Sequence, residues 1–251
     1  NAADAATDPT TTTTRTTSTT GVSSRSSTST STSAPKGSST SGASQNDEAL
    51  GIGDAYFPDT GNPGYDVASY DLTFDVDDDL VGFDAVAKIA LTTTKPLDEL
   101  RLDLDGLEVS KATIDGAEVP HRRAGLDLVL TPQKPLKAKA PVTVTVAYGG
   151  TPEPRASVAL GGLGWIGVPG EGSYVVSEPD GASNWFPAND HPGDKARFDF
   201  EITVPEDVEA VANGTRTGEE TKDGRTTWSW SARDPMATYL ATVAIGQYTF
   251  F

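Results

Sequence analysis

Residues 70–76 read YDLTFDV, and this stretch shows the pattern that decides the fold class. Tyr70, Leu72, Phe74 and Val76 alternate with polar or acidic residues. Successive side chains of a strand point to opposite faces of a sheet, so the alternation predicts a strand with one buried and one solvated face.

The same two-residue alternation recurs along the chain. Further apolar series occupy residues 85–91, 100–104, 126–130, 142–146, 198–204 and 228–230. Asp115-Gly116 and Asp223-Gly224 are hairpin turn signals, because glycine adopts a positive φ at little cost. No segment shows a helical apolar period over three turns. We therefore predict an all-β fold, a multi-stranded antiparallel β-sandwich or saddle, with most charged strand positions on solvated faces.

Composition excludes several classes of function. The 251 residues include 19 Lys and Arg, 36 Asp and Glu, 2 His and no Cys, with a formal net charge of −17. Such an acidic chain repels phosphate, so nucleic acid is not an expected partner. Without Cys, and with two His but no H-E-x-x-H motif, the sequence offers no disulfide and no expected metal site. No apolar run has the length of a transmembrane helix.

Residues 1–45 differ from the rest in composition. They contain 26 Ser and Thr and carry a net charge of +1, whereas residues 46–251 carry −18. Such a segment buries too little apolar surface to offset chain entropy. We predict a disordered Ser/Thr-rich tether over 1–45 and one folded β domain over 46–251. A start at Asn1 ahead of this stretch fits an exported product, secreted or tethered at the cell surface, and a passive linker is the alternative.

The alternation stops between Tyr148 and Arg197, and long irregular segments on a β scaffold often carry function. Residues 174–205 read YVVSEPDGASNWFPANDHPGDKARFDFEITVP. This stretch resembles the N-terminal domain of the aminopeptidase N family of zinc metallopeptidases. The family pattern F-P-x-x-D-x-P-x-x-K-A-x-F is matched by Phe186, Pro187, Asp190, Pro192, Lys195, Ala196 and Phe198. Residues 64–76, 208–214 and 235–248 are similar to the family's opening and closing strands.

The resemblance implies a substrate-binding role for Glu178. In the family, a Glu or Gln nine positions before the Pro of the F-P pair helps to bind the free amino terminus of the substrate, and Glu178 stands nine before Pro187. A carboxylate suits an α-ammonium group, because a charge-assisted hydrogen bond is stronger in a water-poor cleft. Many relatives carry a Gln where this chain has Val176. The alternative for Glu178 is a surface carboxylate at a strand end.

The resemblance also implies parts that this sequence lacks. In the family, a following catalytic domain supplies G-A-M-E-N and H-E-x-x-H and holds zinc, and neither motif occurs here. We therefore expect a fragment or truncated product of an aminopeptidase, inactive by itself. Its expected partners are a downstream catalytic domain of the same polypeptide and peptides with a free amino terminus. Two alternatives stay open: a stand-alone cell-surface β-sandwich binding module that uses the Gly- and Trp-rich segment 161–187, and a paralogue that has lost its catalytic half.

Other polar residues are expected to be structural. We predict that Asp190 caps a turn with Lys195 as its ion-pair partner, and that His191 has no catalytic role because no relay partner is in view. His121 is expected on an exposed loop. The sequon at 213–215 is expected to be a turn, and the four tryptophans to lie in the core or in domain contacts.

Overall fold

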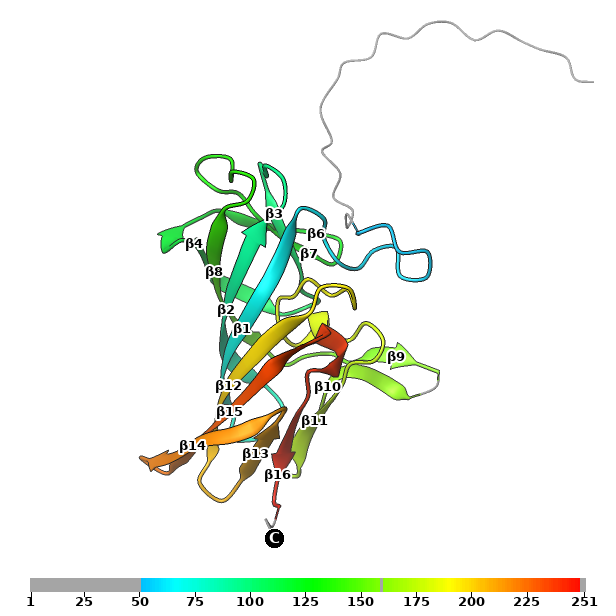
Figure 1. The fold of residues 1–251 in the computed structure, drawn as a ribbon. Coiled ribbons are helices and arrows are strands. Elements are labelled where there is room, and N and C mark those ends of the chain that lie inside the picture. Colours follow the sequence, from blue (N-terminus) through cyan, green and yellow to red (C-terminus); the bar gives the residue numbers. More distant parts are fainter. Residues whose placement is uncertain (1–50, 159, 249–251) are drawn as a thin grey trace, which may run out of the picture. The chain divides into compact units, whose positions relative to one another are not determined.

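The computed structural model describes residues 51–158 and 160–248. These residues form strands and two short 3₁₀ helices, and no α-helix occurs within the two ranges. Figure 1 shows how the strands are arranged. The predicted tether, residues 1–45, lies outside the described residues, as do residues 46–50 of the predicted domain. In the described part of the chain, no helix has the length and apolar character needed to cross a membrane.

The largest sheet has eight strands in the spatial order β14-β15-β12-β1-β2-β8-β4-β5. Their bounds are β1 (Tyr65–Val76), β2 (Phe83–Thr93), β4 (Glu108–Ile114), β5 (Ala117–Glu118), β8 (Pro141–Gly150), β12 (Ala196–Pro205), β14 (Thr215–Lys222) and β15 (Arg225–Met236). Buried and exposed residues alternate along β1, β2 and β12, as the sequence predicts. The prediction of half-buried strands is therefore confirmed for the centre of the sheet.

One pairing in this sheet departs from the predicted antiparallel arrangement. Strands β1 and β12 run parallel, with Tyr70 opposite Phe198 and Phe74 opposite Ile202. Parallel neighbours need a long crossover, and the strands between β1 and β12 provide it. The rings of Tyr70 and Phe198 stack at a centroid distance of 4.9 Å, so this pairing buries aromatic surface.

Two smaller sheets complete the domain, with the orders β13-β16-β11-β10-β9 and β3-β7-β6. The remaining elements are β3 (Leu100–Asp103), β6 (His121–Ala124), β7 (Asp127–Leu130), β9 (Arg155–Ser157), β10 (Gly161–Val168), β11 (Gly172–Val176), η1 (Ala182–Asn184), β13 (Glu209–Ala212), η2 (Thr238–Leu240) and β16 (Val243–Gly246). The expectation of irregular structure between 148 and 197 is wrong for β9, β10 and β11. Glycine recurs through β10. Because glycine has no side chain, it does not contribute to the apolar–polar alternation from which a strand is predicted.

Aromatic side chains join the eight-stranded and five-stranded sheets. Phe74 of β1 lies 6.0 Å from Trp165 of β10 and 5.7 Å from Trp185, measured between ring centroids. Phe83 of β2 meets Trp165 edge-on at 4.8 Å. Each such pair contributes about 0.5–1.5 kcal/mol beyond the burial of its area. The β-sandwich prediction is confirmed by this shared core, which also contains Phe186 of the loop after η1.

Both predicted hairpin turns form where expected. Asp115 and Gly116 join β4 to β5 with φ values of 50° and 79°, and Asp223 and Gly224 join β14 to β15 with φ values of 52° and 78°. Two successive positive φ values identify type I′ turns, whose twist matches that of the flanking strands.

Candidate functional site

Glu178 lies in the tight turn that connects β11 to η1. The residue before it, Ser177, is buried, and its Oγ accepts a hydrogen bond from Trp185 Nε1 at 3.1 Å. The backbone N–H of Gly181 donates to the carbonyl of Ser177 at 2.7 Å and closes the turn. Glu178 itself is exposed. The core therefore holds both ends of the turn, while the carboxylate stays open to solvent.

The side chain of Glu178 borders a small cavity of about 240 Å³. Four segments of the chain enclose the cavity: residues 54–60, the turn at 178–180, the loop at 190–192, and η2. Its lining residues are Asp54, Phe57, Thr60, Glu178, Pro179, Asp180, Asp190, His191, Pro192 and Tyr239. A group bound there would meet four carboxylates, and also two aromatic rings and two prolines.

Three of the four carboxylates are engaged within the protein. Asp180 pairs with Arg155 at 3.2 Å. Asp190 accepts hydrogen bonds from the Ser183 backbone N–H and the Thr238 hydroxyl at 3.0 and 2.7 Å. Burial raises the pKa of Asp190, although these hydrogen bonds oppose the rise.

Asp54 is the third engaged carboxylate. Its Oδ1 accepts the backbone N–H groups of Tyr56 and Phe57 at 2.7 and 2.9 Å, and its Oδ2 lies 3.7 Å from His191 Nε2. The N–H groups of Phe57 and Tyr56 lower the pKa of Asp54. Among the described residues, Glu178 is the one carboxylate of the cavity with no hydrogen-bond or ion-pair partner. It is therefore the one best placed to accept a cation from outside.

His191 borders the cavity but belongs to no catalytic relay among the described residues. Its Nδ1 accepts the backbone N–H of Gly193 at 3.1 Å, which leaves Nε2 as the donor toward Asp54. The arrangement holds two segments of the cavity wall together. These contacts give His191 a structural role in the cavity wall, and the absence of a catalytic role stays a prediction.

Asp190 is structural, as predicted, but the predicted turn cap and the predicted pairing with Lys195 are wrong. Asp190 does not cap its own turn: it is buried, and its carboxylate binds Ser183 and Thr238. Lys195 is exposed, and among the described residues no ion pair joins it to Asp190. A buried carboxylate needs local donors to offset lost hydration, and a backbone N–H and a hydroxyl supply them here.

Sequence reasoning also missed several buried acids. Asp103 and Asp127 are 1% and 0% exposed, although alternation assigned Asp103 to a solvated face. Burial raises the pKa of Asp103 to about 8, with hydrogen bonds from the backbone N–H groups of Asp190 and Gly61 acting in the opposite direction. Asp194 accepts the Val67 backbone N–H and the Asn189 amide. A local pattern carries no signal for these contacts, because most donors come from distant segments.

The remaining expectations have mixed outcomes. Trp165 and Trp185 are buried, as predicted, so the 161–187 segment offers no exposed tryptophan for ligand stacking. Gly214 has a φ of 94°, which confirms the turn, while the Asn213 amide is engaged with Leu240 and Thr242. His121 is exposed, but it begins β6 and does not lie on a loop.

A larger hollow of about 660 Å³ lies along β11 and β16. Val168, Tyr174 and Tyr248 line it, and none of the described lining residues is basic. Glu178 is not among its residues. Within the described ranges, no group of three or more His, Cys, Asp or Glu is arranged to hold a metal ion. A resident zinc therefore does not fit these residues.

Comparison with known proteins gives one family. Residues 67–240 match the Peptidase M1 N-terminal domain. The chain is 23% identical over 185 residues to Probable aminopeptidase 2 of Sulfurisphaera tokodaii, covering 72% of this chain and 22% of that protein.

The solved structures agree. The chain is 31% identical to an M1 zinc metallopeptidase from Deinococcus radiodurans, with a TM-score of 0.73, covering 78% of this chain and 45% of that one. A structure of a mutant of that protein bound to a Tyr-Ser-Ala substrate gives the same TM-score, identity and coverage. The chain thus spans less than half the length of these relatives. The match to the family covers more than half of the 251 residues of this chain. This chain therefore belongs to the M1 peptidase family and carries the family's N-terminal domain.

Proposed function

We propose that this chain forms part of the substrate cleft of a zinc aminopeptidase and that Glu178 binds the α-ammonium group of the peptide. The observation that supports the proposal is that the Glu178 carboxylate is exposed and, among the described residues, unpartnered. Glu178 is exposed at the rim of an acidic cavity and has no partner among the described residues, whereas Asp54, Asp180 and Asp190 all have one.

The physical role follows from the charge. A free amino terminus is cationic at neutral pH, and a hydrogen bond between two ions is stronger than one between neutral groups. The backbone of the turn that carries Glu178 is fixed by Ser177, Trp185 and Gly181, so little backbone entropy is lost when the ammonium binds. Holding the first amine at a fixed point would set which peptide bond reaches the reactive centre.

The reactive centre itself is proposed to lie in another part of the same polypeptide. The M1 relatives are zinc metallopeptidases, and the described residues offer no metal site. The coding sequence downstream of Phe251 tests this directly. An in-frame H-E-x-x-H motif would support the proposal, and a stop codon at that point would refute it.

The role of Glu178 is tested in the full-length polypeptide by Glu178→Ala, with Glu171→Ala as the matched control. Glu171 is also exposed, but it precedes β11 and lies outside the Glu178 cavity. Glu178→Ala should lower kcat/KM for leucine p-nitroanilide by about 10- to 100-fold, because one charge-assisted hydrogen bond contributes about 1.5–3 kcal/mol. The control should stay within about twofold. Unchanged kinetics in Glu178→Ala would remove the assignment.

An extracellular location remains part of the proposal. Its support is compositional: the Ser/Thr-rich segment 1–45 resembles a surface tether. Protease treatment of intact cells should degrade the protein if it is exposed at the surface. Complete protection in intact cells, together with absence from the medium, would contradict this location.

A further inference from the structure

The segment 51–63, which precedes β1, forms a closed loop that we call the strap. Asp54 Oδ1 accepts the backbone N–H groups of Tyr56 and Phe57, and the Thr60 hydroxyl donates to the Phe57 carbonyl at 3.1 Å. The backbone N–H of Ile52 donates to the Thr60 carbonyl at 3.2 Å. These bonds fix the backbone on both sides of Phe57.

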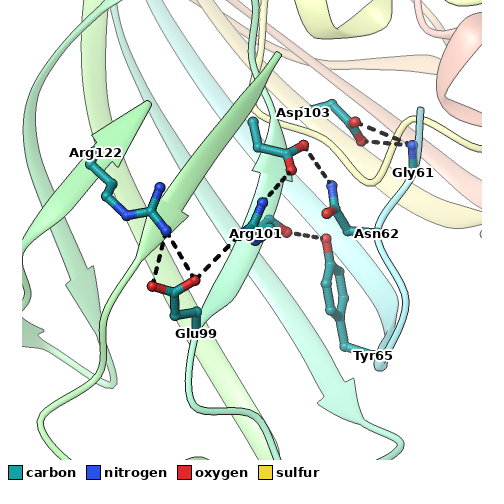
Figure 2. Close-up of polar contacts among 8 residues, drawn as sticks. Gly61, Asn62, Tyr65, Glu99, Arg101, Asp103 and Arg122 are labelled. Carbon is teal, nitrogen blue, oxygen red and sulfur yellow. Dashed lines mark hydrogen bonds and ion pairs between the residues drawn. The ribbon is translucent and has the colours of Figure 1, made fainter. Parts of the chain in front are cut away.

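Buried polar groups fasten the end of the strap to the body of the domain. The backbone N–H of Gly61 donates to both carboxylate oxygens of Asp103, each at 3.2 Å, as Figure 2 shows. The backbone N–H of Asn62 donates to Asn189 Oδ1 at 2.6 Å, and its side-chain amide donates to Asp127 at 3.2 Å.

Asp127, which accepts the hydrogen bond from the Asn62 amide, belongs to an ion-pair network (Figure 2). Arg101 joins Asp127 at 3.2 Å and Glu99 at 3.4 Å, and Arg122 joins Glu99 at 3.2 Å. The Tyr65 hydroxyl donates to the Arg101 carbonyl at 2.6 Å. Side chains from β1, β3, β6 and β7 thus fix one end of the strap.

The strap forms one wall of the Glu178 cavity. Asp54, Phe57 and Thr60 line the cavity from the strap, and the Asp54–His191 contact at 3.7 Å ties this wall to the loop after η1. The ring of Phe57 is 37% exposed, so part of its surface is free for a ligand. Tyr56, its neighbour, is 88% exposed and does not line the cavity.

We infer that the strap selects the substrate: a large apolar side chain on the first residue packs against Phe57 while Glu178 holds the ammonium group. This inference rests on the proposed function. The apolar part of the cavity consists of Phe57, Pro179, Pro192 and Tyr239. Its volume of about 240 Å³ is below the 300–1,000 Å³ typical of sites for larger ligands and suits a single amino-acid residue.

The charges of the cavity exclude the opposite class of substrate. The described lining contains no Lys or Arg, and His191 is engaged with Asp54, so an acidic first side chain would lose its hydration there without gaining an ion-pair partner. Peptides that begin with Phe or Leu are therefore expected to be good substrates, and peptides that begin with Glu poor ones.

The experiment uses the full-length polypeptide and four variants: Phe57→Ala, Phe57→Leu, Tyr56→Ala and Glu178→Ala. The measurement is kcat/KM for p-nitroanilides of Phe, Leu, Ala and Glu. Phe57→Ala should lower the ratio of the Phe or Leu substrate to the Ala substrate by about 10-fold, the usual effect of a hydrophobic contact on specificity. Phe57→Leu, which keeps an apolar side chain, should lower it by less than about threefold, and Tyr56→Ala should leave it unchanged.

The inference is overturned if Phe57→Ala leaves the ratio of kcat/KM between the large and small substrates unchanged. This holds whether kcat/KM stays at the wild-type value or falls equally for every substrate. An equal fall would mean that the strap is purely structural. Glu178→Ala separates this failure from that of the proposed function. It should reduce kcat/KM for all four substrates without altering their order. If it does so while Phe57→Ala leaves the ratio intact, the inference fails and the proposed function stands. If Glu178→Ala is fully active, the proposed function fails.

Discussion

Asp103→Asn tests how the strap and the site loop are held together. The Asp103 side chain accepts the backbone N–H groups of Gly61 and Asp190, and burial raises its pKa from 3.8 to about 8. A carboxyl whose pKa is raised by folding adds stability that is fully present below its unfolded pKa and is lost as the pH rises toward the folded one. Four pH units at about 1.4 kcal/mol each give about 5 kcal/mol as the upper limit of that loss between pH 4 and pH 8.

The variant removes the titration but keeps an acceptor. Asn cannot ionise, and its Oδ1 still accepts one backbone N–H, so at pH 4.5 it should be about 1–2 kcal/mol less stable than the wild type. By pH 8 it should be as stable as the wild type or more so. Urea unfolding reports the free energy, with the buried Trp165 and Trp185 as fluorescence probes.

The control for this experiment is Leu102→Ala in the same strand. Leu102 is fully buried and does not titrate, so its loss should be about 2–5 kcal/mol at both pH values. If the difference between Asp103→Asn and the wild type is the same at pH 4.5 and pH 8, the reasoning is refuted. Asp103 would then be ionised throughout, and its N–H donors would outweigh its burial.

Three further substitutions test the packing around the site. Gly61→Ala should destabilise the chain by about 1–3 kcal/mol in urea unfolding, because Gly61 has a φ of 72° and a Cβ there would lie 2.7 Å from the Cβ of His191; wild-type stability would show that the strap shifts freely. Trp185→Ala should lower the unfolding free energy by about 3–5 kcal/mol, since the ring is fully buried and its Nε1 donates to Ser177; a loss below about 1 kcal/mol would contradict this packing. Asn213→Ala should lower the unfolding free energy by about 1–3 kcal/mol through loss of its contacts with Leu240 and Thr242. A loss below about 0.5 kcal/mol would contradict these contacts.

The strands could be predicted because their signal is local. The alternation in β1, β2 and β12 needs only neighbouring residues, and the Asp-Gly turns need only two. The parallel pairing of β1 with β12 could not be predicted, because it joins residues such as Tyr70 and Phe198 that are far apart in the sequence. The glycines of β10 concealed a strand for a different reason, since they give no apolar period.

The site was only partly predictable for the same reason. Glu178 is marked by its resemblance to a family position, and its spacing alone does not distinguish it from a surface carboxylate. The alternation of Leu100, Leu102 and Leu104 predicts that Asp103 lies on the solvent-exposed face of its strand. It is buried because the strap and the loop after η1 bring N–H donors to it from residues 61 and 190. Neither donor has a signature near β3.

The net negative charge of this domain does not by itself identify a binding site. The site becomes visible when the hydrogen-bond and ion-pair partners of each carboxylate around the cavity are compared. The basic groups that reach the Glu178 cavity are already committed: Arg155 pairs with Asp180 at 3.2 Å and lies 3.8 Å from Asp105, and His191 faces Asp54. Backbone N–H groups donate hydrogen bonds to Asp54 and Asp190, and the Thr238 hydroxyl donates a further one to Asp190. Within residues 51–158 and 160–248, Glu178 has no cationic partner, whereas the other carboxylates of the cavity are paired or hydrogen-bonded. A cavity built in this way favours an incoming ammonium group because binding breaks no existing ion pair, and this is the physical argument for the proposed role of Glu178.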